Sequence, residues 1–65
     1  MKEVKTMNEK LFDYLFEDKE TGEQFLVEAD SYTEAVKIVR QYFDNYSFLE
    51  KMSVEEGEML GLDTY

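Results

Sequence analysis

The 65-residue chain contains no cysteine and no histidine. Without cysteine it has neither disulfide bonds nor thiolate metal ligands, which suits a reducing cytosol. Without either residue type it also lacks the commonest general base and a thiol nucleophile. Ser31 and Ser53 are explained by capping of the helices that they precede. We therefore expect a cytoplasmic protein that is not an enzyme and uses no cofactor.

Proline, internal repeats and low-complexity runs are also absent. No segment approaches the roughly 20 apolar residues that a membrane-spanning helix needs. Residues 1–8 are polar and lack the apolar stretch of a signal peptide, so we expect them to fray or to lengthen the first strand. The acidic loop Asp18/Glu20/Gly22 differs from a calcium loop, since its Gly comes one position early and the closing Glu is missing. Residues 1–65 therefore predict one small acidic α+β domain without a metal site.

The segment from Asp18 to Glu23 predicts a tight hairpin. Gly22 suits the left-handed position of a four-residue loop, and Asp18 suits the start of a type I turn. A shift of one residue would place Glu17 opposite Phe25, so we reject that register. The predicted pairs are Phe16 with Phe25, Tyr14 with Val27, and Phe12 with Ala29.

The two faces of this hairpin differ in chemistry. One face is apolar and is the predicted core: Phe12, Tyr14, Phe16, Phe25, Val27 and Ala29. The other mixes leucines and polar residues: Leu11, Asp13, Leu15, Glu17, Gln24, Leu26 and Glu28. Asp13 lies opposite Glu28, and like charges in such a pair destabilise a sheet by roughly 0.2–1 kcal/mol. This face is either a solvated surface, on which Lys10 or Lys51 reduces the repulsion between Asp13 and Glu28, or a contact surface for a cationic partner.

An amphipathic helix is predicted directly after the hairpin. Ser31 and Glu34 form a capping box, and Asp44-Asn45 is expected to end the helix. Tyr42 and Tyr46 lie in the apolar stripe, so we interpret them as core residues with hydroxyls at the rim and not as base-stacking residues. Apolar residues recur at three- and four-residue spacing: Tyr32, Ala35, Val36, Val39, Tyr42, Phe43 and Tyr46.

The remainder predicts a third strand and a short helix. Ser47 to Met52 forms the strand, with Phe48 and Met52 on one side, and the resulting fold is ββαβ with an additional C-terminal helix. The three-stranded antiparallel sheet has the order 2-1-3, and the amphipathic helix packs on one face. Ser53 and Glu56 form a second capping box for a helix from Val54 to about Leu60, which Gly61 ends. Its apolar edge packs against the leucines of the hairpin or against a second copy of the chain: Val54, Met59, Leu60 and Leu62.

The net charge of −9 is distributed unevenly along the chain. Residues 11–30 carry −6 and residues 47–65 carry −4, whereas residues 31–46 are neutral. Solubility of a small domain requires a net charge of magnitude only about 2–8. The sign opposes direct binding of nucleic acid, because such binding neutralises phosphates with Lys and Arg. The candidate partner-binding residues are therefore acidic: Asp13, Glu17, Asp18, Glu20, Glu23, Glu28, Glu55, Glu56 and Glu58.

These features favour an acidic inhibitor that binds the basic nucleic-acid-binding surface of a nuclease or another DNA- or RNA-handling protein. Same-face residues of a strand repeat every 6.6–6.8 Å, close to the phosphate spacing of DNA, and carboxylates pair bidentately with Arg. In size, acidity and α+β plan the chain resembles the small inhibitors of phages and mobile elements, such as anti-CRISPR proteins and uracil-DNA glycosylase inhibitors. This resemblance implies a guide-loaded Cas effector as partner. The alternative is a self-associating or adaptor module, a homodimer for example, without a link to nucleic acid.

Overall fold

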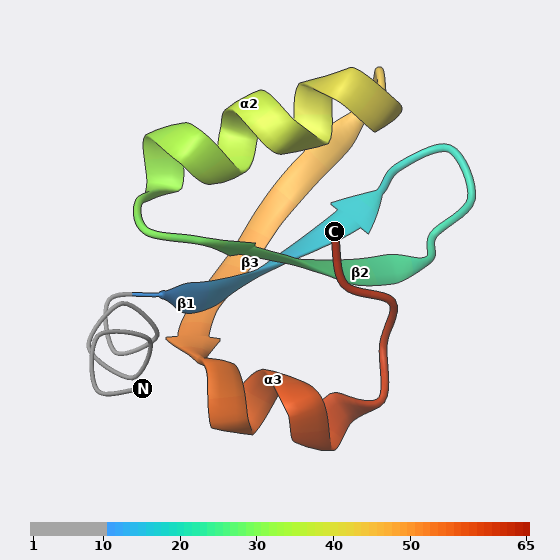
Figure 1. Cartoon of the computed structure of the whole chain (residues 1–65). Helices are drawn as coiled ribbons and strands as arrows, with labels where there is room; N and C mark the ends of the chain where they lie inside the picture. The colour runs from blue at the N-terminus through green and yellow to red at the C-terminus, as the bar shows by residue number, and fades with distance from the viewer. Residues whose placement is uncertain (1–10) are drawn as a thin grey trace.

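The computed structural model describes residues 11–65, so the expectation for residues 1–8 lies outside the described part. The elements follow the order β1 (Phe12–Asp18), β2 (Gln24–Ala29), α2 (Tyr32–Tyr42), β3 (Tyr46–Ser53) and α3 (Val54–Leu60). The strands form an antiparallel sheet in the order β2-β1-β3, as predicted. The two helices lie on opposite sides of this sheet (Figure 1). The chain is an α+β fold.

The predicted hairpin and its register are confirmed. Gly22 has a φ of 82°, the left-handed value expected for the loop glycine. The Glu20 amide donates to Oδ1 of Asp18 at 2.9 Å, and the Asp18 amide donates to the carbonyl of Glu23 at 2.8 Å. These local bonds set the loop length and therefore the register. The observed pairs include Phe16 with Phe25, Tyr14 with Val27, and Phe12 with Ala29.

The core lies between the sheet and α2. Phe16 is fully buried, and its ring stacks on that of Phe25 with 5.8 Å between centroids. Phe25 in turn stacks on Phe43, whose centroid is 4.2 Å away. The helix contributes the buried Ala35 and Val39. The α2 face of the sheet is thus an aromatic core, as the apolar face of the hairpin predicts.

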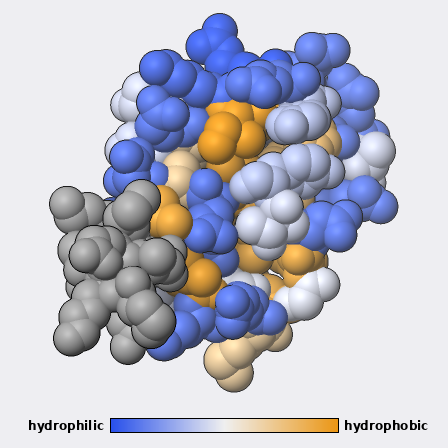
Figure 2. Space-filling model, viewed as in Figure 1, coloured by the Kyte–Doolittle hydropathy of each residue, from blue (hydrophilic) through white to orange (hydrophobic). Residues whose placement is uncertain are grey.

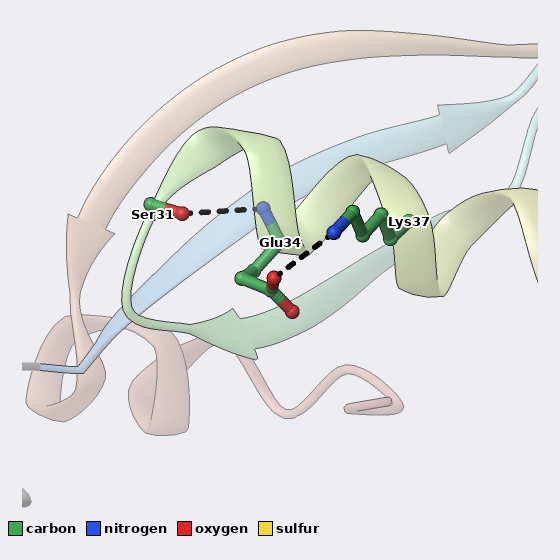
Figure 3. A network of polar contacts seen from close by, with 3 residues as sticks. All are labelled: Ser31, Glu34 and Lys37. Carbon is green, nitrogen blue, oxygen red and sulfur yellow. Dashed lines mark hydrogen bonds and ion pairs between the residues drawn. The ribbon is translucent and has the colours of Figure 1, made fainter.

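The N-terminus of α2 forms half of the predicted capping box. Oγ of Ser31 accepts a hydrogen bond from the Glu34 amide at 3.2 Å (Figure 3). The Glu34 carboxylate does not return this bond, and instead lies 3.5 Å from Nζ of Lys37. The serine therefore provides a hydrogen-bond acceptor for one of the amides at the helix start that have no partner within the helix.

The end of α2 and two of its tyrosines differ from the prediction. The helix ends at Tyr42, and Phe43 is extended, so the chain leaves the helix just before Asp44. Tyr46 is the first residue of β3, and its ring centroid lies 5.9 Å from that of Phe16. Tyr42 is 60% exposed and is not part of the core cluster; its ring centroid lies 5.1 Å from that of Tyr65. The assignment of Tyr42 to the core is wrong.

A β-bulge in β3 changes which residues share a face. Phe16 pairs with Phe48 but the preceding Leu15 pairs with Glu50, so Leu49 is an extra residue. Phe48 therefore packs on the α2 side, and its ring lies 5.6 Å from that of Phe16. The prediction that Phe48 and Met52 lie on one side is wrong, because one inserted residue reverses the alternation.

The bulge also determines where Lys51 points. Lys51 pairs with Tyr14, and its Nζ lies 4.1 Å from the centroid of the Phe12 ring. Met52, the next residue, pairs with Asp13. Lys51 is consequently on the side opposite to the leucine and carboxylate face, and the expectation that it relieves repulsion there is wrong.

The last elements follow the sequence closely. Ser53 and Glu56 form both halves of a capping box, and Gly61 ends α3 with a φ of 70°. Thr64 then forms a parallel bridge to Leu26, supported by a hydrogen bond of 2.8 Å from the Leu26 amide to the carbonyl of Asp63. This segment pairs with the outer edge of β2. None of the described helices is long and apolar enough to cross a membrane.

Candidate functional site

The short helix α3 covers the leucine and carboxylate face of the sheet. Leu15 and Leu26 of this face are buried, with exposed fractions of 9% and 1%. Gly57 of α3 is buried against Asp13, and a Cβ atom at this position would overlap the Asp13 carboxylate. The helix approaches the sheet closely only because residue 57 has no side chain.

Asp13 is consequently a buried carboxylate and not an outward contact residue. Its side chain is 1% exposed, and Oδ1 has no hydrogen-bond partner. Burial raises the pKa of this carboxyl above its ordinary value of 3.8, and the negative charges of Glu28 and Glu58 raise the pKa further. The expectation that Asp13 lies on an accessible binding surface is wrong, because α3 closes over it.

Tyr14 is a second buried ionisable group, on the opposite side of the sheet. Its ring lies 6.3 Å from those of Tyr32 and Phe48. Burial raises the pKa of the hydroxyl above its ordinary value of 10.0, and the Asp30 carboxylate adds to this shift. The hydroxyl therefore stays neutral at physiological pH, and the α2 side gains no buried negative charge.

The other predicted contact residues remain accessible to different degrees. Glu17 and Asp18 are half-buried, and the remaining six are exposed. Asp18 and Glu56 have structural roles, because their carboxylates accept backbone hydrogen bonds in the turn and at the start of α3. Six carboxylates are left for a partner, all without such a role: Glu17, Glu20, Glu23, Glu28, Glu55 and Glu58.

The fold divides these six residues into two groups. Glu17, Glu20 and Glu23 belong to the hairpin end and are called the turn group. Glu28, Glu55 and Glu58 come from β2 and α3 and together line a cavity of about 500 Å³; they are called the pocket group. The apolar part of the same lining consists of Leu11, Phe12 and Val54. The structure thus brings together acids that are up to 30 positions apart in the sequence.

A second cavity, of about 290 Å³, lies on the same side of the sheet. Its lining includes Leu15 and Met52 of the sheet, Leu60 of α3, and the carboxylates of Glu50 and Glu56. Glu50 was not a predicted contact residue. Both cavities next to α3 therefore combine aliphatic side chains with carboxylates.

None of these carboxylates forms an ion pair within residues 11–65. Within residues 11–65, the single ion pair joins Glu34 and Lys37 on the exposed side of α2 (Figure 3). Hydrophilic residues cover much of the described surface in Figure 2, with smaller hydrophobic groups between them. The acids of the turn and pocket groups thus have no cationic partner in the described part of the chain.

Sequence reasoning missed two features of this site. The first is the meeting of Glu28 with Glu55 and Glu58, which depends on how α3 docks and leaves no local signal. The second is Gly57, for which a signal exists: a glycine inside a predicted helix costs about 1 kcal/mol relative to alanine and so indicates a packing requirement. No group of three or more possible metal ligands occurs within residues 11–65.

The exposed carboxylates of the two groups offer charge complementarity to a cationic surface. Comparison of the chain with protein-family models, with curated proteins and with solved structures gives no match in any of the three.

Proposed function

We propose that the protein is an acidic inhibitor that binds the basic nucleic-acid-binding surface of a nuclease or another DNA- or RNA-handling protein. One observation carries the proposal: six exposed or half-buried carboxylates have neither a structural role nor a cation within residues 11–65. Such uncompensated charge lowers stability by self-repulsion, and a basic partner removes this repulsion on binding. A guide-loaded Cas effector is one partner of this chemistry.

The geometry favours recognition through two acidic clusters. A phosphate-like row along β1 requires Asp13 and Glu17 to face outward together, and Asp13 is buried. The turn group, on the β1–β2 hairpin end, and the pocket group, on β2 and α3, remain as the acidic surfaces. The hairpin and α3 themselves can be followed in Figure 1. Carboxylates on these elements suit arginine side chains that otherwise contact phosphates or guanine edges.

A capture experiment tests this function. The immobilised full chain is exposed to cellular proteins that have first been eluted from a DNA column, and duplex DNA is then used as competitor. We expect captured proteins to be released by duplex DNA and by raising salt from about 0.05 to 0.5 M, because screening weakens contacts between exposed charges. Capture that resists both salt and DNA, or no capture, contradicts the proposal.

Two matched triple variants locate the contact. E17Q/E20Q/E23Q removes the turn group, and E28Q/E55Q/E58Q removes the pocket group, with the same change in net charge. We expect capture to weaken in at least one of them. Retention of DNA-competed capture by both variants would show that neither acidic group makes the contact.

The alternative, self-association, has lost one part of its original basis and keeps the other. Leu15 and Leu26 of the apolar strip are buried. Met59 and Leu60 of the apolar C-terminal edge are 86% and 48% exposed.

An open edge remains at β3, where Phe48 is 39% and Leu49 is 42% exposed. A bulge at Leu49 and the charged Lys51 interrupt this edge, and both features are typical of edges that resist pairing. Sizing chromatography over a range of protein concentrations distinguishes a monomer from a dimer.

A further inference from the structure

The cavity beside α3 has walls of two kinds. Leu11, Phe12 and Val54 supply apolar surface, while Glu28, Glu55 and Glu58 supply three carboxylates. Its volume of about 500 Å³ is within the range of ordinary ligand pockets in proteins. A ligand that fits both kinds of wall is itself amphipathic, with an aliphatic part and a cationic end.

A buried carboxylate adds to the negative charge at this place. Asp13 pairs with Glu28 across the two strands, and its side chain is 1% exposed with Oδ1 unpartnered. Glu28 and Glu58, which line the cavity, both act on Asp13 electrostatically. Asp13 itself does not line the cavity, but its buried charge is repelled by Glu28 and Glu58, which are exposed on the cavity wall. A cation that pairs with Glu28 and Glu58 reduces this repulsion.

The described part of the chain supplies no such cation. The cationic residues within 11–65 are Lys19, Lys37, Arg40 and Lys51. The Lys37 ammonium pairs with Glu34 on α2, and Lys19 and Arg40 form no ion pair with a described carboxylate. The Lys51 ammonium lies 4.1 Å from the centroid of the Phe12 ring, a cation–π contact, and forms no ion pair with a described carboxylate. Phe12 is the one aromatic residue among the described residues that line the cavity, and its ring already interacts with a positive charge.

We infer that this cavity binds an arginine side chain of a basic protein partner. The guanidinium group is planar, has five N–H donors, and is more weakly hydrated than an ammonium group, so it suits a site with several carboxylates and an apolar wall. Its three methylene groups pack against Leu11 and Val54 while the head group pairs with Glu28 and Glu58. The inference rests on the proposed function, for which it names the site and the side chain that is recognised.

The test uses the full-length protein and a defined probe, N-acetyl tetra-arginine amide, with the tetra-citrulline and tetra-lysine peptides as comparisons. Binding is followed by ¹H–¹⁵N correlation spectra. We expect shifts of the Val54, Glu55 and Glu58 amides with tetra-arginine, weaker shifts with tetra-lysine and none with the uncharged citrulline peptide. In E28Q/E58Q the affinity for tetra-arginine is expected to fall about tenfold, because charge-assisted pairs are lost. In the matched control E20Q/E23Q it changes less than about twofold.

Several outcomes overturn the inference. Equal losses of tetra-arginine affinity in E28Q/E58Q and E20Q/E23Q indicate attraction by net charge alone. Equal affinities for the arginine and lysine peptides show that the guanidinium group is not specifically recognised. Residues 1–10 contain Lys2, Lys5 and Lys10. If binding appears only in the variant K2Q/K5Q/K10Q, the cavity is occupied by the chain's own lysines and is not a partner site.

The results also separate this inference from the proposed function. DNA-competed capture that persists in E28Q/E58Q and disappears in E17Q/E20Q/E23Q refutes the arginine pocket and leaves the inhibitor function standing. Specific tetra-arginine binding at the cavity without any DNA-competed capture refutes the inhibitor function and leaves the pocket standing.

Discussion

The two faces of the sheet are covered by helices of different length and pack different kinds of side chain. On the α2 side, Phe16, Phe25 and Val39 form a close-packed interior without a buried charge. On the α3 side, a seven-residue helix packs against the buried carboxylate of Asp13, and Leu15 and Leu26 of this face are buried. The first face supplies stability through apolar burial. The second brings the carboxylates of Asp13, Glu28 and Glu58 close to one another, which lowers the stability of the fold. Such arrangements are often found at functional sites.

The largest expected effect is on the α2 side. Replacement of Phe16 by alanine removes a fully buried ring that stacks on Phe25, and such changes destabilise by about 3–5 kcal/mol. Urea unfolding followed by circular dichroism measures the loss. If the alanine variant does not fold, Phe16→Leu is expected to give a measurable loss of roughly 1 kcal/mol. A loss below that of the α3-side variants would show that this face is not the main core.

A smaller effect with an unusual sign is expected at Gly57. Alanine in a helix interior is normally about 1 kcal/mol better than glycine. At this position its Cβ overlaps the Asp13 carboxylate, and overpacking costs about 1–3 kcal/mol. We therefore expect Gly57→Ala to be destabilising by about 1–2 kcal/mol in urea unfolding. Glu55→Ala in the same helix serves as control, and addition of Asp13→Ala is expected to restore part of the loss. A stabilised Gly57→Ala variant would contradict the close approach of α3.

Asp13→Asn is expected to stabilise the protein at neutral pH by on the order of 1 kcal/mol, because it removes a buried charge that Glu28 and Glu58 repel. The pKa of Asp13 is raised in the folded state, so this group destabilises the protein above its folded pKa. As the pH falls through that pKa towards the ordinary value of 3.8, the penalty disappears. The stability difference between wild type and Asp13→Asn should therefore shrink on acidification, which urea unfolding at several pH values measures. A difference independent of pH would exclude ionisation as its cause.

The smallest effect is expected on the exposed side of α2. Glu34 and Lys37 are 3.5 Å apart and their side chains are half or more exposed, so salt and water screen the pair. Glu34→Gln is expected to lower stability by only about 0.3 kcal/mol, with the Ser31 cap intact. Thermal unfolding at low and high salt measures this. A loss above about 1 kcal/mol would show that Glu34 also completes the capping box in solution.

The site could be predicted only in part, and Asp13 and Glu58 show why. The sequence placed both among the contact residues, since acidity and strand position are local properties. Their environments depend on α3, which buries Asp13 and places Glu58 beside Glu28. Whether an acid is accessible is decided by contacts between residues distant in sequence, and a single sequence does not specify these.

The sequence by itself determined the hairpin register, the N-cap of each helix, and the left-handed glycines in the hairpin loop (Gly22) and at the end of α3 (Gly61). These features are local, because turn chemistry and capping act over a few residues. Only the tertiary structure decided the bulge at Leu49, the orientation of Lys51 and the burial of Asp13. These features arise where strands pair and helices dock, so their energies come from partners far along the chain.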